Sequence, residues 1–193
     1  PLFRSASKIA RAEVEYIEFS GEQGILTDIV PRVYSQDSRI YIDYQLTRID
    51  VSQRTGTLSS YLEFCSPDGS VQRDSRYPAD FARHYIETIG TPHGVFFDGN
   101  PIKAYGFIAS DNKDPTRGFV FGAVRLSGTK YGIYARVYSV RMEDLNGTER
   151  FNWNPVRFTN EYGETEGAMY DRVSGELFRN AGSGYFVIGP DKE

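Results

Sequence analysis

The sequence predicts an all-β fold, built as a sandwich or a barrel, and three observations support this class. The 193 residues include 14 Tyr and 13 Phe, aromatic residues that suit the pleated, half-buried surface of a sheet. They also include 19 Gly, the residue type that tight turns favour. Short segments of alternating polarity recur between Gly-containing turns, and many short strands joined in this way are typical of sandwiches and barrels.

The chain begins with a basic segment, residues 1–12 (PLFRSASKIARA), which differs in character from the rest of the chain. Arg4, Lys8 and Arg11 meet no acidic residue there, and helical spacing would bring these three cations to one side. Two interpretations are open: a frayed terminus, or an arm that docks on another copy of this chain or on another protein of the same assembly. We expect an N-terminal arm over 1–12 and one β domain over 13–193, a length suited to a single domain.

The clearest strand is RIYIDYQL (39–46). Ile40, Ile42, Tyr44 and Leu46 alternate with Tyr41, Asp43 and Gln45, which predicts a strand with one buried face. Similar patterns predict further strands at 59–64, 83–88, 94–97, 102–109, 118–124, 132–142, 167–171 and 185–188.

Turn signals separate these strands, at 67–69, 98–99, 146–147, 174–175 and 182–184. The one helix candidate is PADFARHY (78–85), for which we favour a turn that leads into a strand. The last predicted strand must return beside the first, since Gly182 and Gly184 allow a tight reversal. This pairing of the two chain ends would hide a sheet edge.

Several stretches together resemble one known domain family. VEYIEFSGEQGILTDIVPRVYSQDSRIYIDYQL (14–46) is similar to the opening of laminin-G-like, concanavalin A-like domains, and GAMYDRVSGELFRNAGSGYFVIGP (167–190) is similar to their closing segment. Between them, RHYIETIGTPHGVFFDGNPI (83–102) resembles the central hairpin and GIYARVYSVRMEDLNG (132–147) resembles the long penultimate strand. Such domains occur in gut-bacterial surface proteins and in phage and prophage proteins.

The resemblance implies a jelly-roll sandwich of two antiparallel sheets, in a family whose members mostly bind glycans or proteins rather than catalyse. It also implies a structural role for His84. Because laminin-G-like domains often bind calcium at a loop rim, the oxygen donors Asp111, Asn112 and Asp114 are a candidate calcium site. A solvated turn is the alternative, as Lys113 lies within this group.

The run EVEYIEF (13–19) raises the question of catalysis. Sugar-cleaving jelly rolls of the laminarinase type resemble its spacing of acids, and a retaining glycosidase needs two carboxyl groups about 5–5.5 Å apart. However, plain alternation puts Glu13 and Glu15 on one face and Glu18 on the other, so catalysis would require a bulge. We therefore expect a first strand with solvated acids and no enzymatic activity.

The sequence shows little sign of other kinds of catalytic or metal site. No G-x-S-x-G motif is present to provide a nucleophilic serine, and no phosphate-binding loop is recognisable. The single cysteine, Cys65, lies in an apolar segment, which indicates a buried thiol. With only two histidines, His84 and His93, and no cysteine cluster, a zinc site is not expected.

Trp153, the only tryptophan, is flanked by Asn152 and Asn154 in FNWNPVRF, which we interpret as a loop. An exposed Trp between amides would form a platform for a sugar ring, and Tyr105 is a weaker candidate for the same role. The alternative is that Trp153 fills the core under that loop. The candidate ligand-binding set is therefore Asn152, Trp153, Asn154 and Tyr105.

The net charge and the hydropathy of the chain limit the kinds of partner that we expect it to bind. A net charge of −4 gives no general attraction to nucleic acid or to an anionic membrane, and no apolar segment approaches the ~20 residues of a membrane span. We expect a phage virion component, a capsid decoration or tail protein, that exposes a β-sandwich to glycans or proteins. Two alternatives remain, a secreted or cell-surface carbohydrate-binding module and a glycoside hydrolase.

Overall fold

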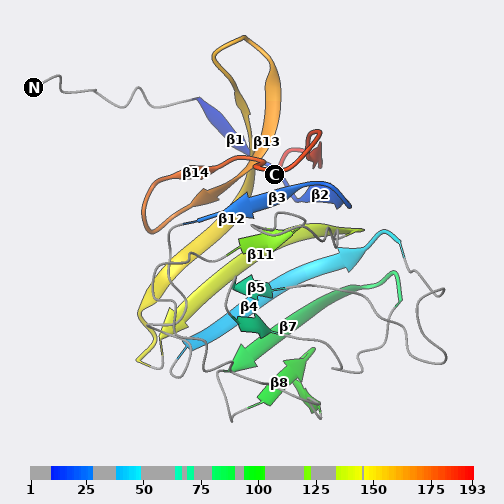
Figure 1. The fold of residues 1–193 in the computed structure, drawn as a ribbon, viewed down its shortest axis with the longest axis vertical. Helices are drawn as coiled ribbons and strands as arrows, with labels where there is room; N and C mark the ends of the chain where they lie inside the picture. The colour runs from blue at the N-terminus through cyan, green and yellow to red at the C-terminus, as the bar shows by residue number, and fades with distance from the viewer. Residues whose placement is uncertain are drawn as a thin grey trace, which may run out of the picture.

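The computed structural model of this chain describes residues 10–27, 38–48, 64–66, 69–71, 80–89, 94–102, 120–122, 134–144 and 146–193. Within these ranges the regular structure consists of β-strands (Figure 1). The same ranges contain no helix with the length and apolar character of a membrane span. The predicted all-β class is confirmed.

The first strands are β1 (Arg11–Glu13), β2 (Ile17–Ser20), β3 (Gly24–Leu26), β4 (Ser38–Leu46), β5 (Phe64–Ser66), β6 (Gly69–Val71), β7 (Arg83–Ile89) and β8 (Gly94–Phe97). They are followed by β9 (Asn100–Ile102), β10 (Val120–Gly122), β11 (Tyr134–Asp144), β12 (Glu149–Thr159), β13 (Thr165–Asp171), β14 (Leu177–Phe178) and β15 (Val187–Ile188).

Eleven of the described strands form one large antiparallel sheet. Its main path runs in the order β14-β13-β12-β11-β4-β7-β8-β9, and the long strands β12, β11, β4 and β7 lie side by side at its centre (Figure 1). The sheet divides where β11 changes partner along one edge. Its first half pairs with β2, from Tyr134↔Ser20 to Val137↔Ile17, whereas Val140–Glu143 pairs with β12. Strand β12 in turn pairs with β1 beyond this point.

The two ends of the domain meet in this division of the sheet. Strand β15 pairs with β2 through Ile188↔Ile17, and Val14 forms an isolated bridge with Asp191. The backbone N–H of Gly189 also donates to the carbonyl of Tyr16 at 3.0 Å. The expectation that the last strand returns beside the first is therefore confirmed.

Strand β12 is long and central, although its sequence FNWNPVRF had indicated a loop. A proline disfavours a central strand because it has no N–H to donate to a neighbour. Pro155 is tolerated because it lies where the partner on one side of β12 changes from β11 to β1. Its carbonyl accepts a hydrogen bond from the Val14 N–H at 3.1 Å, and it lies opposite Met169 on the other side.

The main core lies on one face of the large sheet. Its largest buried side chains include Phe19, Tyr44, Phe151 and Trp153, from strands β2, β4 and β12. The four-stranded antiparallel sheet β3-β10-β5-β6 contributes Ile25 to this same core. Large and small sheets therefore share one apolar cluster.

Several turn predictions are confirmed. Asp98 and Gly99 have φ values of +48° and +80° between β8 and β9, as an Asp-Gly hairpin turn requires, and Gly147 and Gly175 also have positive φ. The segment 80–82 forms bends and Arg83 begins β7, so the described part of the helix candidate at 78–85 is a turn that leads into a strand. The predictions at 59–63 and 103–109 lie outside the described residues.

Candidate functional site

The acidic run EVEYIEF is divided between two strands. Glu13 ends β1, the chain bends at Glu15, and Glu18 lies in β2. The Glu13 carboxylate binds Arg172 at 2.9 Å and the Glu18 carboxylate binds Arg136 at 3.1 Å. Both acids are at least partly exposed, in agreement with the expectation of solvated acids on the first strands.

Trp153 faces the core. It is 0 % exposed, its ring stacks on Phe151 with centroids 4.6 Å apart, and Phe178 lies 5.0 Å away. Of the two interpretations made from the sequence, the structure therefore agrees with the core residue and not with a surface platform. Asn152 and Asn154 alternate with Trp153 along β12 and point to the opposite side, where the Asn154 amide donates to Asn152 at 3.0 Å.

This opposite side of the large sheet carries polar and aromatic residues, and we call it the polar face. Residues directly opposite one another in antiparallel strands project from the same face. Register pairs such as Arg141↔Tyr41, Arg141↔Asn152 and Asp43↔Tyr85 therefore define its members. We restrict the name to fifteen residues at the centre of this side, which Phe96, Tyr134 and Tyr170 flank. The fifteen are Glu18, Arg39, Tyr41, Asp43, Gln45, Arg83, Tyr85, Glu87, Arg136, Tyr138, Arg141, Glu143, Glu149, Asn152 and Asn154.

A β-bulge places Tyr138 at the centre of the polar face. The register between β11 and β4 shifts between Val137 and Ser139, so that Tyr138 is the extra residue. Its hydroxyl donates to Gln45 Oε1 at 2.9 Å, and the Arg83 guanidinium lies 3.7 Å from its ring centre. On its other side Tyr16 approaches edge-on at 5.5 Å.

Arg83 and Asp43 form a bidentate ion pair on this face. The Nε and Nη2 atoms of Arg83 donate to the two Asp43 oxygens at 2.7 and 2.6 Å. This hydrogen bonding to Asp43 raises the pKa of Arg83 above its ordinary value, so the guanidinium stays charged. The Arg83 side chain in this pair is about half exposed to solvent.

A second group surrounds Tyr41. Its hydroxyl donates to Glu143 at 2.6 Å and the Arg141 guanidinium lies 4.1 Å from its ring centre. Burial, together with the hydrogen bond to Glu143, raises the pKa of Tyr41 to about 12, so its hydroxyl remains a donor at neutral pH. Tyr85 lies 5.9 Å from Tyr41 and is 38 % exposed, which makes it the most accessible ring of the polar face.

His84 alternates with Tyr85 on β7 and points to the other side of the sheet. It is 9 % exposed and lies 4.4 Å from Phe97, and each ring nitrogen meets a carboxylate: Nδ1 lies 2.8 Å from Asp98 and Nε2 lies 2.7 Å from Asp80. Burial lowers the pKa of His84, but the hydrogen bonds to Asp98 and Asp80 outweigh it and raise the pKa above its ordinary value. The same Asp98 accepts from the Tyr85 N–H at 2.8 Å.

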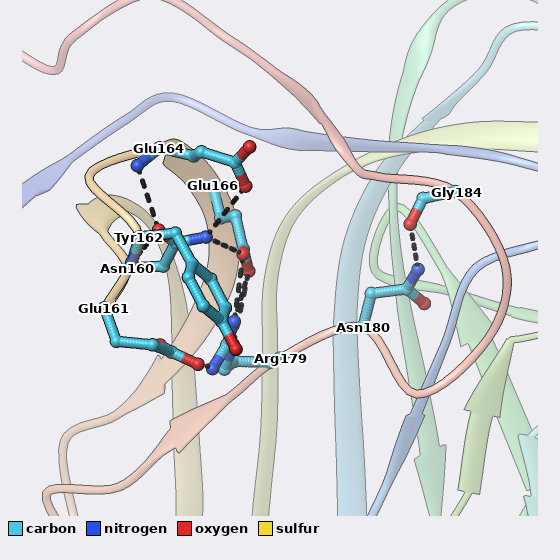
Figure 2. Close-up of polar contacts among 8 residues, drawn as sticks. All are labelled: Asn160, Glu161, Tyr162, Glu164, Glu166, Arg179, Asn180 and Gly184. Carbon is cyan, nitrogen blue, oxygen red and sulfur yellow. Dashed lines mark hydrogen bonds and ion pairs between the residues drawn. The ribbon is translucent and has the colours of Figure 1, made fainter.

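The β12–β13 hairpin extends beyond the rest of the sheet (Figure 1) and carries a separate polar network (Figure 2). The Asn160 amide donates to Glu166 at 2.6 Å, and its oxygen accepts from the N–H groups of Tyr162 and Glu164. Arg179 then binds Glu166 at 2.9 Å, as Figure 2 shows. These bonds close the hairpin, and Tyr162 at its tip is 80 % exposed.

A cavity of about 710 Å³ lies beside this hairpin. It combines the apolar side chains of β12 and β14 with carboxylates, and it lies close to where the described chain begins. Its lining residues are Ala10, Phe158, Thr159, Asn160, Glu161, Glu176, Leu177 and Arg179. It has no exposed aromatic ring among these residues, so the polar face is the better candidate for sugar binding.

The other residues singled out from the sequence have mixed outcomes. Arg11 begins β1, where it pairs with Phe158 and its guanidinium lies 3.6 Å from the Tyr170 ring centre. Seven of these residues lie outside the described part of the chain, namely Arg4, Lys8, His93, Tyr105, Asp111, Asn112 and Asp114. The side chain of Cys65 also lies outside it. Within the described part, no three His, Cys, Asp or Glu residues are placed to hold a metal ion.

The polar face could not be identified from the sequence as a site, because its residues come from strands that are distant along the chain. The alternation of Tyr41, Asp43 and Gln45 with buried residues was the only signal for it. Comparisons with protein-family models, with curated proteins and with solved structures find no match for this chain.

Proposed function

We propose that this chain is a non-enzymatic recognition module that binds glycans on its polar face. The single observation that carries the proposal is the accessible Tyr85 ring, framed on the same face by the Asp43–Arg83 pair and by Arg141. Sugars bind proteins by stacking a ring face on an aromatic side chain while carboxylates, amides and guanidinium groups bond their hydroxyls. Asn152 and Asn154 extend this set of donors and acceptors along β12.

The fold that we propose for the module is the two-sheet jelly roll of laminin-G-like, concanavalin A-like domains. It is supported by the resemblance of residues 14–190 to this family, by the antiparallel strand pairing and by the meeting of the chain ends. The small sheet that shares Ile25 with the main core fits the second sheet of such a sandwich.

A glycoside hydrolase is the alternative within the same fold. A catalytic acid is kept protonated by apolar surroundings. Glu13 and Glu18 instead bind Arg172 and Arg136 and are partly exposed. This favours binding over cleavage, and release of reducing sugar from a β-glucan by the purified chain would overturn it.

For the biological setting we propose the surface of a phage virion, as a capsid decoration or tail protein. This rests on the resemblance to phage-borne domains and on the basic N-terminal segment, whose Arg4 and Lys8 suit an assembly arm, whereas Arg11 belongs to β1 of the domain. The cavity beside the β12–β13 hairpin supports such docking, since Glu161 and Glu176 line it and Ala10 lies at its border. The alternative setting is a secreted or cell-surface adhesion module.

Glycan-array binding followed by calorimetry tests the recognition role. We expect Tyr85→Ala to weaken binding of the best glycan about tenfold, the value of one aromatic contact. Tyr162→Ala is the matched control, because this tyrosine is exposed but lies at the hairpin tip, away from the polar face. Equal losses in both variants, or no glycan bound by the wild type, would refute the proposal.

A further inference from the structure

We propose that the polar face selects uncharged saccharides over acidic ones and that the Asp43–Arg83 pair sets this selectivity. The inference rests on the proposed glycan-binding function and adds the class of ligand. Its basis is the way charge is distributed and paired over the fifteen residues that define the face.

Positive and negative charges nearly balance on the polar face. The face carries four guanidinium groups, from Arg39, Arg83, Arg136 and Arg141, against five carboxylates, from Glu18, Asp43, Glu87, Glu143 and Glu149. Its formal charge is therefore −1, in spite of its many arginines. An acidic sugar gains no net attraction from such a surface.

The guanidinium groups of the polar face already have partners on that face. Arg136 binds Glu18 at 3.1 Å, and Arg141 binds Glu143 at 3.3 Å and Glu149 at 3.7 Å. Arg39 lies close to the Tyr41 hydroxyl, Glu87 and Glu143, and these groups raise its pKa. Because planar guanidinium groups bind carboxylates best in a bidentate manner, a ligand carboxylate would have to displace these internal partners.

Arg83 is the decisive residue because it is the most exposed of these cations beside Tyr85. Asp43 occupies its Nε and Nη2 donors at 2.7 and 2.6 Å, the geometry in which a sialic acid or uronic acid carboxylate would bind. Asp43 thus stands where an acidic ligand would place its own charge. Sugar hydroxyls, in contrast, can donate to Asp43 and accept from the remaining Arg83 donors without breaking the pair.

The Asp43–Arg83 pair therefore favours neutral sugars over acidic sugars beside Tyr85. A neutral sugar that stacks on Tyr85 keeps every ion pair of the face intact. An acidic sugar at the same position meets the Asp43 carboxylate at close range and is repelled. Substitution of Asp43 by Asn removes the repulsion, keeps the shape of the side chain and releases the charge of Arg83 for a ligand carboxylate.

The experiment uses an array on which neutral oligosaccharides are printed beside their sialylated counterparts, followed by calorimetry on the best pair. For the wild type we expect binding of the neutral member and at least about tenfold weaker binding of the sialylated member. Asp43→Asn is expected to reduce this preference by about tenfold or more through stronger binding of the sialylated member. Arg83→Gln, which removes the cation, is expected to leave the sialylated member excluded.

Asp191→Asn is the matched control. Asp191 also forms a bidentate pair with a half-exposed arginine, Arg157 at 2.6 and 2.8 Å, but this pair lies outside the polar face. We expect this control to keep the wild-type preference. If the wild type binds sialylated glycans as well as neutral ones, or if Asp43→Asn leaves the preference unchanged, the inference is overturned while glycan binding stands. If neither class binds, glycan recognition itself is refuted.

Discussion

Removal of the Trp153 side chain is expected to destabilise the protein severely without acting on a ligand site. The ring is 0 % exposed and packs between Phe151 and Phe178. A buried aromatic side chain removes about 200 Å² from water. At about 25 cal/mol per Å² this corresponds to about 5 kcal/mol, close to the ~3–5 kcal/mol observed when a core aromatic is replaced by Ala. Domains are stable by only about 5–15 kcal/mol, so Trp153→Ala is expected to take a third or more of the total.

Urea unfolding followed by far-ultraviolet circular dichroism measures this loss, because the variant has no tryptophan left for fluorescence. In the wild type, Trp153 emission should be that of a buried indole, protected from acrylamide and unchanged when a glycan is added. Trp153→Phe keeps a stacked ring on Phe151 and should retain most of the stability and all of the glycan affinity. The reasoning fails if Trp153→Phe folds normally but no longer binds, since Trp153 would then be part of the ligand site.

Two further predictions concern His84 and the N-terminal segment. Because carboxylates on both ring nitrogens raise the pKa of His84, its contribution to stability is complete below pH 6.5, the unfolded value, and is lost as the pH rises through the higher folded value. The melting temperature should therefore fall by a few degrees towards alkaline pH, and His84→Gln should abolish this part of the profile while a Tyr162→Ala control keeps it. Deletion of residues 1–9, which leaves the β1–β12 pairing intact, should preserve the melting temperature but abolish sedimentation with a large particle. A truncated chain that still assembles would remove the assembly role of this segment.

The sequence was most informative where buried and exposed residues alternate without interruption. Ile42, Tyr44 and Leu46 are buried on one side of β4 as predicted, whereas Tyr41 is also buried, because Arg141 and Tyr85 cover it on the polar face. Local alternation indicates which side of a strand a residue occupies. It does not indicate which neighbours will cover that side.

Strand β12 shows the opposite case, in which local signals were misleading. Pro155 and the two asparagines beside Trp153 favour a loop when the segment is considered alone. The segment can nevertheless form a strand, because Pro155 lies where the partner of β12 changes from β11 to β1. That change depends on where β1 and β11 lie in the sheet. The polar face was missed for a related reason, since Asp43, Arg83 and Tyr138 meet only after β4, β7 and a bulge in β11 have paired.

The division of the large sheet also has a consequence for how the protein is made. Among the described strands, β2 pairs with β11 and β15, and β1 pairs with β12. These two strands therefore find no described sheet partner before Tyr134 has been synthesised. Contacts of such long sequence separation slow folding. During synthesis the apolar residues Ile17 and Phe19 would remain exposed, which is the state that chaperones recognise and in which chains aggregate. Low yield in an expression host would then reflect the order of synthesis rather than a weak native fold, and a larger supply of chaperone would be the remedy.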